Sequence, residues 1–309
     1  MMRPLLRPWL KMATLALSAA VVSACGGSAA RPRTGTILAV AAENQYANVI
    51  GQIGGSYVTA VAIESNPNTD PHSFEASPSV AATLAAARMI VENGAGYDAF
   101  IDSVDASASQ TPGRLIDVQK LLHLPAQIAN PHLWYRPTTM PALARAVAHE
   151  LSVLEPAHAS YFSARARAFD RSLDPWFAAI RAFRRRFPHV RVATTEPVGD
   201  YLLSALGAAN QTPFSLAADI MNGIDPAPEN VSRQDELLSG HRVRVLLYNE
   251  QVTDPLTASF LAKAKAARIP VVALYETMPT PGYDYQSWML AEIGALTRAL
   301  ASGRSTEHL

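Results

Sequence analysis

The chain has 309 residues, of which 49% are hydrophobic and 17% charged. This is an ordinary globular composition, and the length is sufficient for one large domain or for two lobes that each bury a core. The 26 basic and 26 acidic residues balance. The one basic cluster, at residues 181–186, is expected in the solvated last turn of a helix, where cations suit the dipole. These features argue against a nucleic-acid-binding protein.

Residues 1–24 have the pattern of a secretory signal peptide. Three basic residues, Arg3, Arg7 and Lys11, precede a short apolar run at 12–22. That run is too short to cross about 30 Å of hydrocarbon as a helix. Removing the signal takes three of the 26 basic residues and leaves 23 against 26 acidic ones, a net charge of about −3. We therefore expect an extracytoplasmic protein.

Cys25, the only cysteine, follows Val22, Ser23 and Ala24. This arrangement resembles a bacterial lipobox, in which the cysteine becomes the lipidated first residue of the mature protein. A single cysteine in an exported protein has no disulfide partner within its own chain, so lipidation is the better use for it. The sequence predicts a lipid anchor at Cys25 and a flexible tether over 25–35. The alternative is a chance cysteine after an ordinary signal.

From residue 36 onward, short β-rich runs alternate with helical stretches. This alternation predicts βαβ units and mostly parallel sheets. The expected strands are 37–43, 58–63, 88–94, 114–118, 190–197, 243–250 and 271–276. The expected helices are 46–53, 79–87, 97–104, 138–154, 199–207, 230–240, 256–267 and 285–302.

Residues 156–187 break this rhythm, because they are helical in character throughout and contain no strand. Pro175 lies within them and is expected to kink the helix or restart it as a second piece. The predicted fold is α/β, with an N-terminal lobe at 36–155, a long connecting helix at 156–188 and a C-terminal lobe at 189–309.

Four residues that can bind a metal follow predicted strands: His72, His132, Glu196 and Glu276. In open parallel sheets, ligands bind beyond the carboxyl ends of the strands. Two of the four come from each lobe, so one ion between the lobes could join them. Imidazoles and carboxylates suit Zn²⁺, Mn²⁺ and similar divalent ions. Position alone leaves a second interpretation open, in which each is an ordinary hydrogen-bonded loop or surface residue.

The common enzyme signatures are absent from the sequence: it has no glycine-rich phosphate loop, GxSxG elbow, HExxH or CxxC. Instead, the segments DPHSFEASPS, NPHLW, TTEP and YE together resemble the cluster A-I solute-binding proteins of bacterial zinc and manganese ABC transporters. The resemblance covers essentially the whole mature chain. It includes the run RMIVENGAGYDAFID and the long connector between lobes.

By this resemblance, His72 and His132 match the two ligands of the first lobe. Glu196 matches the third position, which is His or Glu in the family, and Glu276 the fourth, which is more commonly Asp. Asn130 stands where the family usually has an aspartate. Asp219 and Asp225 are alternatives to Glu276, and Glu250 is expected either to brace the cleft through hydrogen bonds or to be a surface carboxylate.

The resemblance implies a binding protein rather than an enzyme. It would be monomeric, anchored to the membrane by lipid, and would deliver Zn²⁺ or Mn²⁺ to an ABC permease and its ATPase. The long histidine-rich loop that many zinc-binding members of the family carry is missing, so manganese is slightly favoured as the expected metal. Three alternatives stay open: a metal-dependent hydrolase with Glu196 as general base, a surface adhesin or metallochaperone, and a receptor for an iron chelate or corrinoid. Convergence of the four side chains on one point would exclude the last.

Overall fold

The computed structural model describes residues 35–68, 70–101 and 115–309. The predicted signal peptide, Cys25 and most of the tether therefore lie outside the described residues. Within them, the strands form two four-stranded sheets, ordered β2-β1-β3-β4 and β6-β5-β7-β8, and every pairing is parallel. The strands are β1 (Ile37–Glu43), β2 (Val58–Glu64), β3 (Met89–Glu92), β4 (Leu115–Asp117), β5 (Arg191–Thr194), β6 (Ala209–Asn210), β7 (Leu246–Asn249) and β8 (Val271–Leu274).

Among the described residues, helices make most of the connections between consecutive strands, as is usual for parallel pairing. The α-helices are α1 (Asn44–Gly54), α2 (Pro78–Ala86), α4 (Val118–Leu121), α5 (Thr139–Leu154), α6 (Ala159–Ser172), α7 (Asp174–Arg186), α8 (Asp200–Leu206), α9 (Phe214–Met221), α10 (Pro228–Ser239), α11 (Pro255–Ala266) and α12 (Tyr285–Ser302). The short 3₁₀ helices are η1 (Gly55–Tyr57), η2 (Pro71–Ser73), η4 (Leu133–Tyr135) and η5 (Pro156–His158).

The central strand β1 shows why its sequence is apolar at nearly every position. It lies between β2 and β3, and all seven of its residues are buried. Ala39 and Ala41 belong to one hydrophobic cluster, whereas Leu38 and Val40 belong to another. The two faces of this sheet are therefore both covered, which is the usual situation of a parallel strand. The α/β class with parallel sheets is confirmed.

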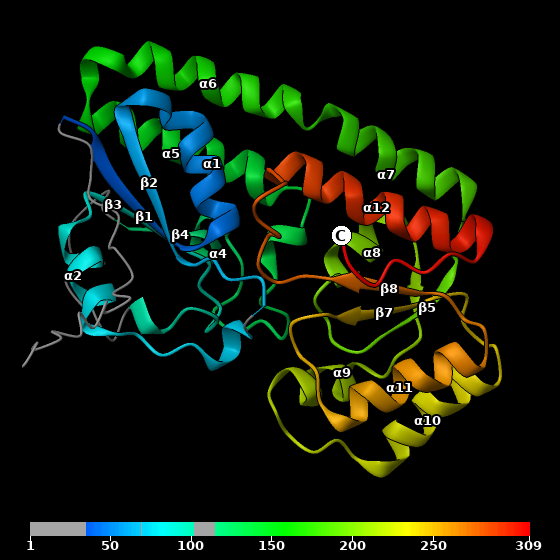
Figure 1. The fold of residues 1–309 in the computed structure, drawn as a ribbon. Coiled ribbons are helices and arrows are strands. Elements are labelled where there is room, and N and C mark those ends of the chain that lie inside the picture. Colours follow the sequence, from blue (N-terminus) through cyan, green and yellow to red (C-terminus); the bar gives the residue numbers. More distant parts are fainter. Residues whose placement is uncertain (1–34, 69, 102–114) are drawn as a thin grey trace, which may run out of the picture. The chain divides into compact units, whose positions relative to one another are not determined.

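The long connector consists of two helices, α6 and α7, with the break at Leu173 (Figure 1). Pro175 lies in the first turn of α7, where a proline needs no hydrogen-bond partner for its nitrogen. The predicted division at this proline is confirmed. Helix α6 packs against α5 and α1 beside the first sheet, and α7 packs against α12 and α8 beside the second. The connector thus contacts both lobes.

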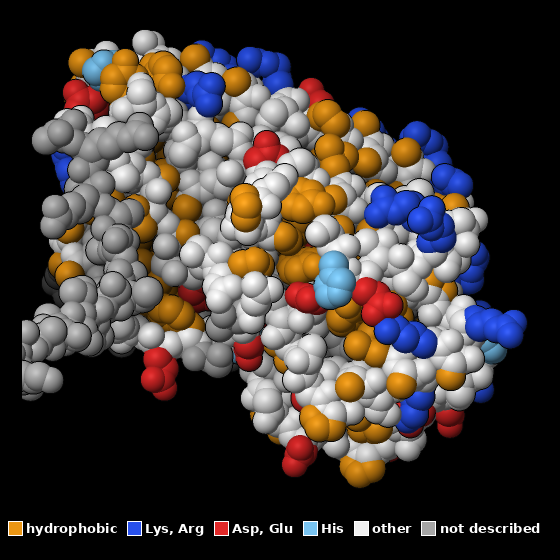
Figure 2. Space-filling view, viewed as in Figure 1, with side chains coloured by type: hydrophobic (Ala, Val, Ile, Leu, Met, Phe, Trp, Pro, Cys, Tyr) orange, Lys and Arg blue, Asp and Glu red, His pale blue; other side chains and the backbone are white. Residues whose placement is uncertain are grey.

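The basic residues of the connector are solvated. Arg184, Arg185 and Arg186 are exposed in the last turn of α7. Figure 2 shows Lys and Arg side chains spread along the side of the molecule that carries the connector in this view, without a large continuous basic surface. Among the helices that the structure describes, none has the length and apolar character needed to cross a bilayer.

Two elements of the second lobe were not predicted. Strand β6 has only two residues, and α9 has eight. Both follow β5 in a segment that lacks a long periodic pattern. Conversely, the helix predicted at 97–104 lies partly outside the described residues; within them, the chain from 95 to 99 forms turns and residues 100 and 101 are helical.

Candidate metal centre

The loop after β2 holds His72 through a local hydrogen bond. The Asp70 carboxylate accepts from the His72 backbone N–H at 2.8 Å, and Pro71 occupies the first position of the short helix η2. This pattern caps a helix start and fixes the direction in which the next side chain leaves the backbone. The His72 side chain retains 22% exposure. It is thus held at the end of a strand and still reachable from solvent.

His132 is fully buried, and Asn130 determines which of its ring nitrogens carries the proton. The Asn130 amide donates through Nδ2 to the carbonyl of Pro197 at 2.7 Å, so its Oδ1 faces His132. That oxygen accepts from the His132 backbone N–H at 3.0 Å and lies 2.8 Å from Nδ1. The neutral ring therefore carries its proton on Nδ1 and presents the Nε2 lone pair to the site, the arrangement typical of a metal-binding histidine.

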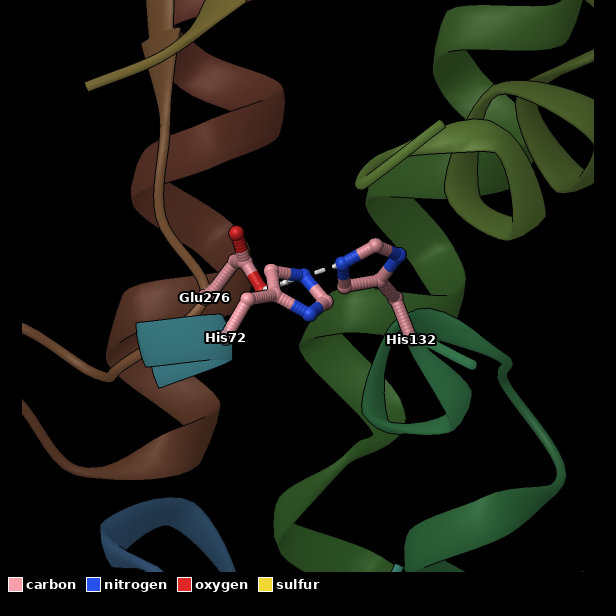
Figure 3. A group of neighbouring side chains, drawn as sticks. All are labelled: His72, His132 and Glu276. Carbon is pink, nitrogen blue, oxygen red and sulfur yellow. Dashed lines mark hydrogen bonds and ion pairs between the residues drawn. The ribbon is translucent and has the colours of Figure 1, made fainter. Parts of the chain in front are cut away.

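Glu276 follows β8 and brings the second lobe to the two histidines (Figure 3). Its Oε2 lies 3.1 Å from His132 Nε2 and 3.2 Å from His72 Nε2. One ligand atom from each of these three residues lies within 4.8 Å of the other two. Glu276 itself has no exposed surface. The structure thus brings together three of the four residues expected to bind metal.

Two further side chains donate hydrogen bonds to Glu276. The Tyr97 hydroxyl donates to Oε2 at 2.7 Å, and Asn249 Nδ2 donates to Oε1. The Tyr97 ring also packs edge-on against both imidazoles, with centroid distances of 5.1 Å to His72 and 5.9 Å to His132. These contacts orient the carboxylate and cover the group with an aromatic ring.

The electrostatics of the group favour an ionised carboxylate. Burial opposes ionisation of Glu276, but protonated imidazoles at His132 and His72 would outweigh it and hold the pKa of Glu276 below its usual range. Burial would lower the pKa of His72, but the hydrogen bond and charge of Glu276 raise it to about 9. Burial dominates for His132 and lowers its pKa. Without metal, His72 is therefore the cation of the group, and His132 is neutral.

The neutral His132 ring presents a lone pair to the site that a metal ion could bind. Its Nε2 lone pair faces a carboxylate oxygen only 3.1 Å away. Two electron pairs at this distance repel one another unless a cation lies beside them. Without metal, protonated His72 is that cation, and a bound divalent ion would take its place. Imidazole nitrogen and carboxylate oxygen are also ligand types that zinc accepts. The three residues therefore fit a divalent ion.

Glu196, the fourth candidate, lies at the edge of the group rather than within it. Asn249 Nδ2 donates to Glu196 Oε2 at 3.1 Å as well as to Glu276, so one amide separates the two carboxylates. Glu196 is 2% exposed, and its Oε1 is buried without a hydrogen-bond partner among the described residues. Burial, followed by the charge of Glu276, raises the pKa of Glu196 to about 8. A cation nearby would favour its ionised form.

The other acidic candidates lie elsewhere. Neither Asp219 nor Asp225 belongs to the metal-binding group found in the described residues. Glu250 pairs with the exposed His308 at 3.1 Å, so the interpretation as a surface carboxylate holds and the predicted bracing of the cleft is wrong. The neighbouring Asn249 makes those bracing contacts instead, because strand residues alternate between faces.

Sequence reasoning also missed Tyr97. It lies in the turns after β3, where no periodic pattern singles out one side chain. The general rule that ligands gather beyond the carboxyl ends of parallel strands was the available signal, since β3 lies beside β1 in the first sheet. The same rule points to Asn249, the last residue of β7.

Two parallel-sheet lobes with a group of two histidines and a carboxylate between them define a class of protein, the two-lobed metal-binding receptors. A family model described as zinc-uptake complex component A, periplasmic (ZnuA), matches residues 39–299. The chain therefore belongs to this family, and the resemblance predicted from its motifs is confirmed. Members of this family are periplasmic components of zinc-uptake complexes, and this chain is a metal-binding component of an ABC transporter. Comparison with curated protein sequences finds no match.

Solved structures share the fold. The periplasmic zinc-binding protein TroA from Treponema pallidum has a TM-score of 0.73 at 18% identity, over 86% of this chain and 100% of TroA. The solute-binding protein FpvC from Pseudomonas aeruginosa, in complex with Mn²⁺, has a TM-score of 0.70 at 22% identity, over 86% of this chain and 98% of FpvC. A metal-free mutant of a periplasmic metal-binding protein from Candidatus Liberibacter asiaticus has a TM-score of 0.70 at 14% identity, over 86% and 100% of the two chains.

Proposed function

We propose that this chain captures Zn²⁺ or Mn²⁺ between its lobes through His72, His132, Glu276 and Glu196 and passes the ion to an ABC permease driven by its ATPase. The observation that carries this assignment is the approach of two imidazole Nε2 atoms to one carboxylate oxygen, at 3.1 and 3.2 Å. The orientation of His132 by Asn130 supports it, because metal-bound histidines commonly donate their other ring nitrogen to such a partner.

The ion is cargo rather than a catalyst in this proposal. His132 and Glu276 have no exposed surface, and Glu196 is 2% exposed. A catalytic zinc site keeps one coordination position open to water and substrate, whereas these side chains enclose the site. The chain is proposed to work as a monomer, held at the extracytoplasmic membrane surface by a lipid on Cys25.

The types of ligand at the site determine the order of its affinities for Zn²⁺ and Mn²⁺. Two imidazoles and two carboxylates accept both borderline and hard divalent ions, and Zn²⁺ exceeds Mn²⁺ in intrinsic affinity for such a site. We expect the protein to bind both, with zinc tighter. Which ion it carries in the cell then depends on availability as well as on affinity.

A matched pair of histidine variants tests the site. His132→Ala removes a buried ligand, whereas His149→Ala removes a histidine of α5 whose side chain is 74% exposed. We expect one Zn²⁺ per chain in the wild type and in His149→Ala, measured by calorimetric titration, and no stoichiometric binding in His132→Ala. Retention of one tightly bound ion by His132→Ala, with its fold shown intact by circular dichroism, would contradict the proposal.

A further inference from the structure

Three buried carboxyl side chains gather at the strand ends of the first lobe, outside the metal centre. Glu43 ends β1 and Glu64 ends β2, and the two are register partners, so their side chains lie on the same face of the sheet. Asp98 comes from the turns after β3. Glu43 is 1% exposed, Glu64 7% and Asp98 2%. We refer to Glu43, Glu64 and Asp98 as the acid cluster.

The acid cluster lacks partners for its charge. Asp98 accepts hydrogen bonds from the backbone N–H groups of Asn93 and Gly94. By contrast, both carboxylate oxygens of Glu64 are buried without a hydrogen-bond partner among the described residues. The hydrogen-bond partner of the buried Glu43 carboxyl group is Asp98, which is itself an acid. An ionised carboxylate in this situation would be strongly disfavoured, so Glu43 and Glu64 are held as neutral acids.

The groups that face the cluster are mostly acidic. The charged and titratable groups that act on it are Asp70, His72 and Glu276 on Glu64, and Tyr46 and Tyr97 beside Glu43. His72 is the one cation among them, and it is paired with Glu276. Burial, followed by the charge of Asp98, raises the pKa of Glu64 to about 8. Burial raises the pKa of Asp98 to about 7, and burial with the charge of Asp98 raises the pKa of Glu43 well above its usual value.

The acid cluster is linked to the metal centre in two ways: by the contact of Tyr97 with Glu276, and by the electrostatic interaction of Glu64 with Glu276. Tyr97 is the chain neighbour of Asp98, and its hydroxyl contacts Glu276. The Glu64 and Glu276 carboxylates repel one another electrostatically. A divalent cation bound at Glu276 would reverse this effect, because its charge exceeds that of the carboxylate. Ionisation of Glu64 then becomes favourable.

We propose that Glu43, Glu64 and Asp98 form a proton store that tunes the metal affinity of the neighbouring centre. As the ion enters, the O–H bond of Glu64 breaks, its proton passes to water, and the carboxylate keeps the electron pair. The negative charge left on the cluster then strengthens the hold on the ion. This inference rests on the proposed metal site, but it makes a separate statement about protons.

The test counts protons released when Mn²⁺ binds near pH 7, from calorimetric titrations in buffers of different ionisation enthalpy. Glu64→Gln is the informative variant, because glutamine mimics the neutral acid but has no proton to release. We expect Glu64→Gln to release fewer protons per ion than the wild type. Glu75→Gln is the control, since Glu75 is an exposed carboxylate three residues after His72. Its proton count should equal that of the wild type.

The difference in Mn²⁺ affinity between Glu64→Gln and the wild type should depend on pH. At about pH 9 the Glu64 carboxylate is ionised and attracts the ion, so Glu64→Gln should bind Mn²⁺ about tenfold more weakly than the wild type. At about pH 6 wild-type Glu64 is neutral, and the two proteins should bind equally. A residue with only a structural role would not produce this dependence on pH.

A second variant and a spectroscopic measurement cover the case in which Glu64→Gln does not fold. Glu43→Gln should also lower the proton count, and infrared difference spectra should show a smaller loss of protonated-carboxyl absorption on Mn²⁺ binding in this variant than in the wild type, in which Glu196 also loses its proton. Equal proton counts in the wild type and in folded Glu64→Gln or Glu43→Gln, or an equal loss of protonated-carboxyl absorption in the wild type and these variants, would overturn the proton store and leave the metal site intact. Absence of Mn²⁺ and Zn²⁺ binding by the wild type would instead refute the proposed function.

Discussion

His132 shows how one amide can prepare a ligand before any ion arrives. Asn130 is fixed by its hydrogen bond to the carbonyl of Pro197, and its Oδ1 accepts a hydrogen bond from His132 Nδ1 at 2.8 Å. The other ring nitrogen is thereby left as an electron-pair donor directed at the site. Such partners commonly change metal affinity by about 10–100-fold.

This role of Asn130 predicts different Zn²⁺ affinities for two substitutions at this position. Asn130→Ala removes the acceptor, so Zn²⁺ affinity should fall by about 10–100-fold. Asn130→Asp keeps an acceptor for Nδ1 and should retain affinity within a factor of about ten of the wild type. Competition titration against a chelator of known affinity measures both. Equal affinities for Asn130→Ala and the wild type would refute the role.

At the residue scale, sequence alone identified the strand-end positions but not the contacts between them. His72, His132 and Glu276 carry a chemical signature that makes them candidates wherever they occur at strand ends. Asn130 was noted only as a departure from the family's aspartate, and Tyr97 and Asn249 were not singled out. Their contribution depends on distances across the two lobes, such as the 2.7 Å from Tyr97 to Glu276. Local spacing does not contain that information.

At the scale of elements, α12 carries a buried acid that is not part of the metal-binding group. Glu292 is 2% exposed, and its Oε1 accepts from Tyr135 at 3.1 Å and from Trp288 at 3.0 Å. Burial raises the pKa of Glu292 to about 8, although these two hydrogen bonds work in the opposite direction. The folded protein therefore holds a proton here that the unfolded chain releases near its ordinary value of 4.5.

The sign of the pH effect follows from this difference. Because the folded-state pKa is the higher one, the contribution of Glu292 to stability is complete below about pH 4.5 and is lost as pH rises towards about 8. Glu292→Gln has no proton to lose, so its stability should fall less than that of the wild type between pH 5 and pH 8. Urea unfolding at several pH values measures this. Parallel pH profiles for the two proteins would contradict it.

The long elements of this fold could be predicted from sequence, and the short ones could not. The 18-residue helix α12 and the apolar strand β1 have clear patterns, and Pro175 marks the division of the connector. The two residues of β6 are recognisable only through their pairing with β5. Such short elements owe their conformation to tertiary neighbours more than to their own sequence.

At the scale of the whole molecule, hydrogen bonds between the lobes fix the position of Glu276. Asn44 of α1 donates to the Met278 carbonyl at 2.8 Å and accepts from the Met278 N–H at 3.0 Å. Gln45 donates to the backbone carbonyl of Glu276 itself at 3.1 Å. These contacts are buried, so they tie the loop after β8 directly to the first lobe.

Removing the hydrogen bonds of Asn44 should lower both the stability of the protein and its affinity for Zn²⁺. Asn44→Ala leaves both backbone groups of Met278 without their partner, which should lower the free energy of unfolding by about 1–3 kcal/mol. Zn²⁺ affinity should also fall, because Met278 lies two residues from Glu276. Asn230→Ala is a suitable control, since Asn230 makes an exposed hydrogen bond with Ser215. Thermal unfolding with and without Zn²⁺ compares the two, and equal stabilities would contradict the expectation.

The most direct test of the metal site is a crystal structure of the protein grown with Zn²⁺, with anomalous diffraction recorded at the zinc absorption edge. We predict one strong peak about 2.0–2.2 Å from His72 Nε2, His132 Nε2 and a Glu276 oxygen, with Glu196 as the fourth ligand. A strong peak elsewhere, with these side chains free of metal, would contradict the account.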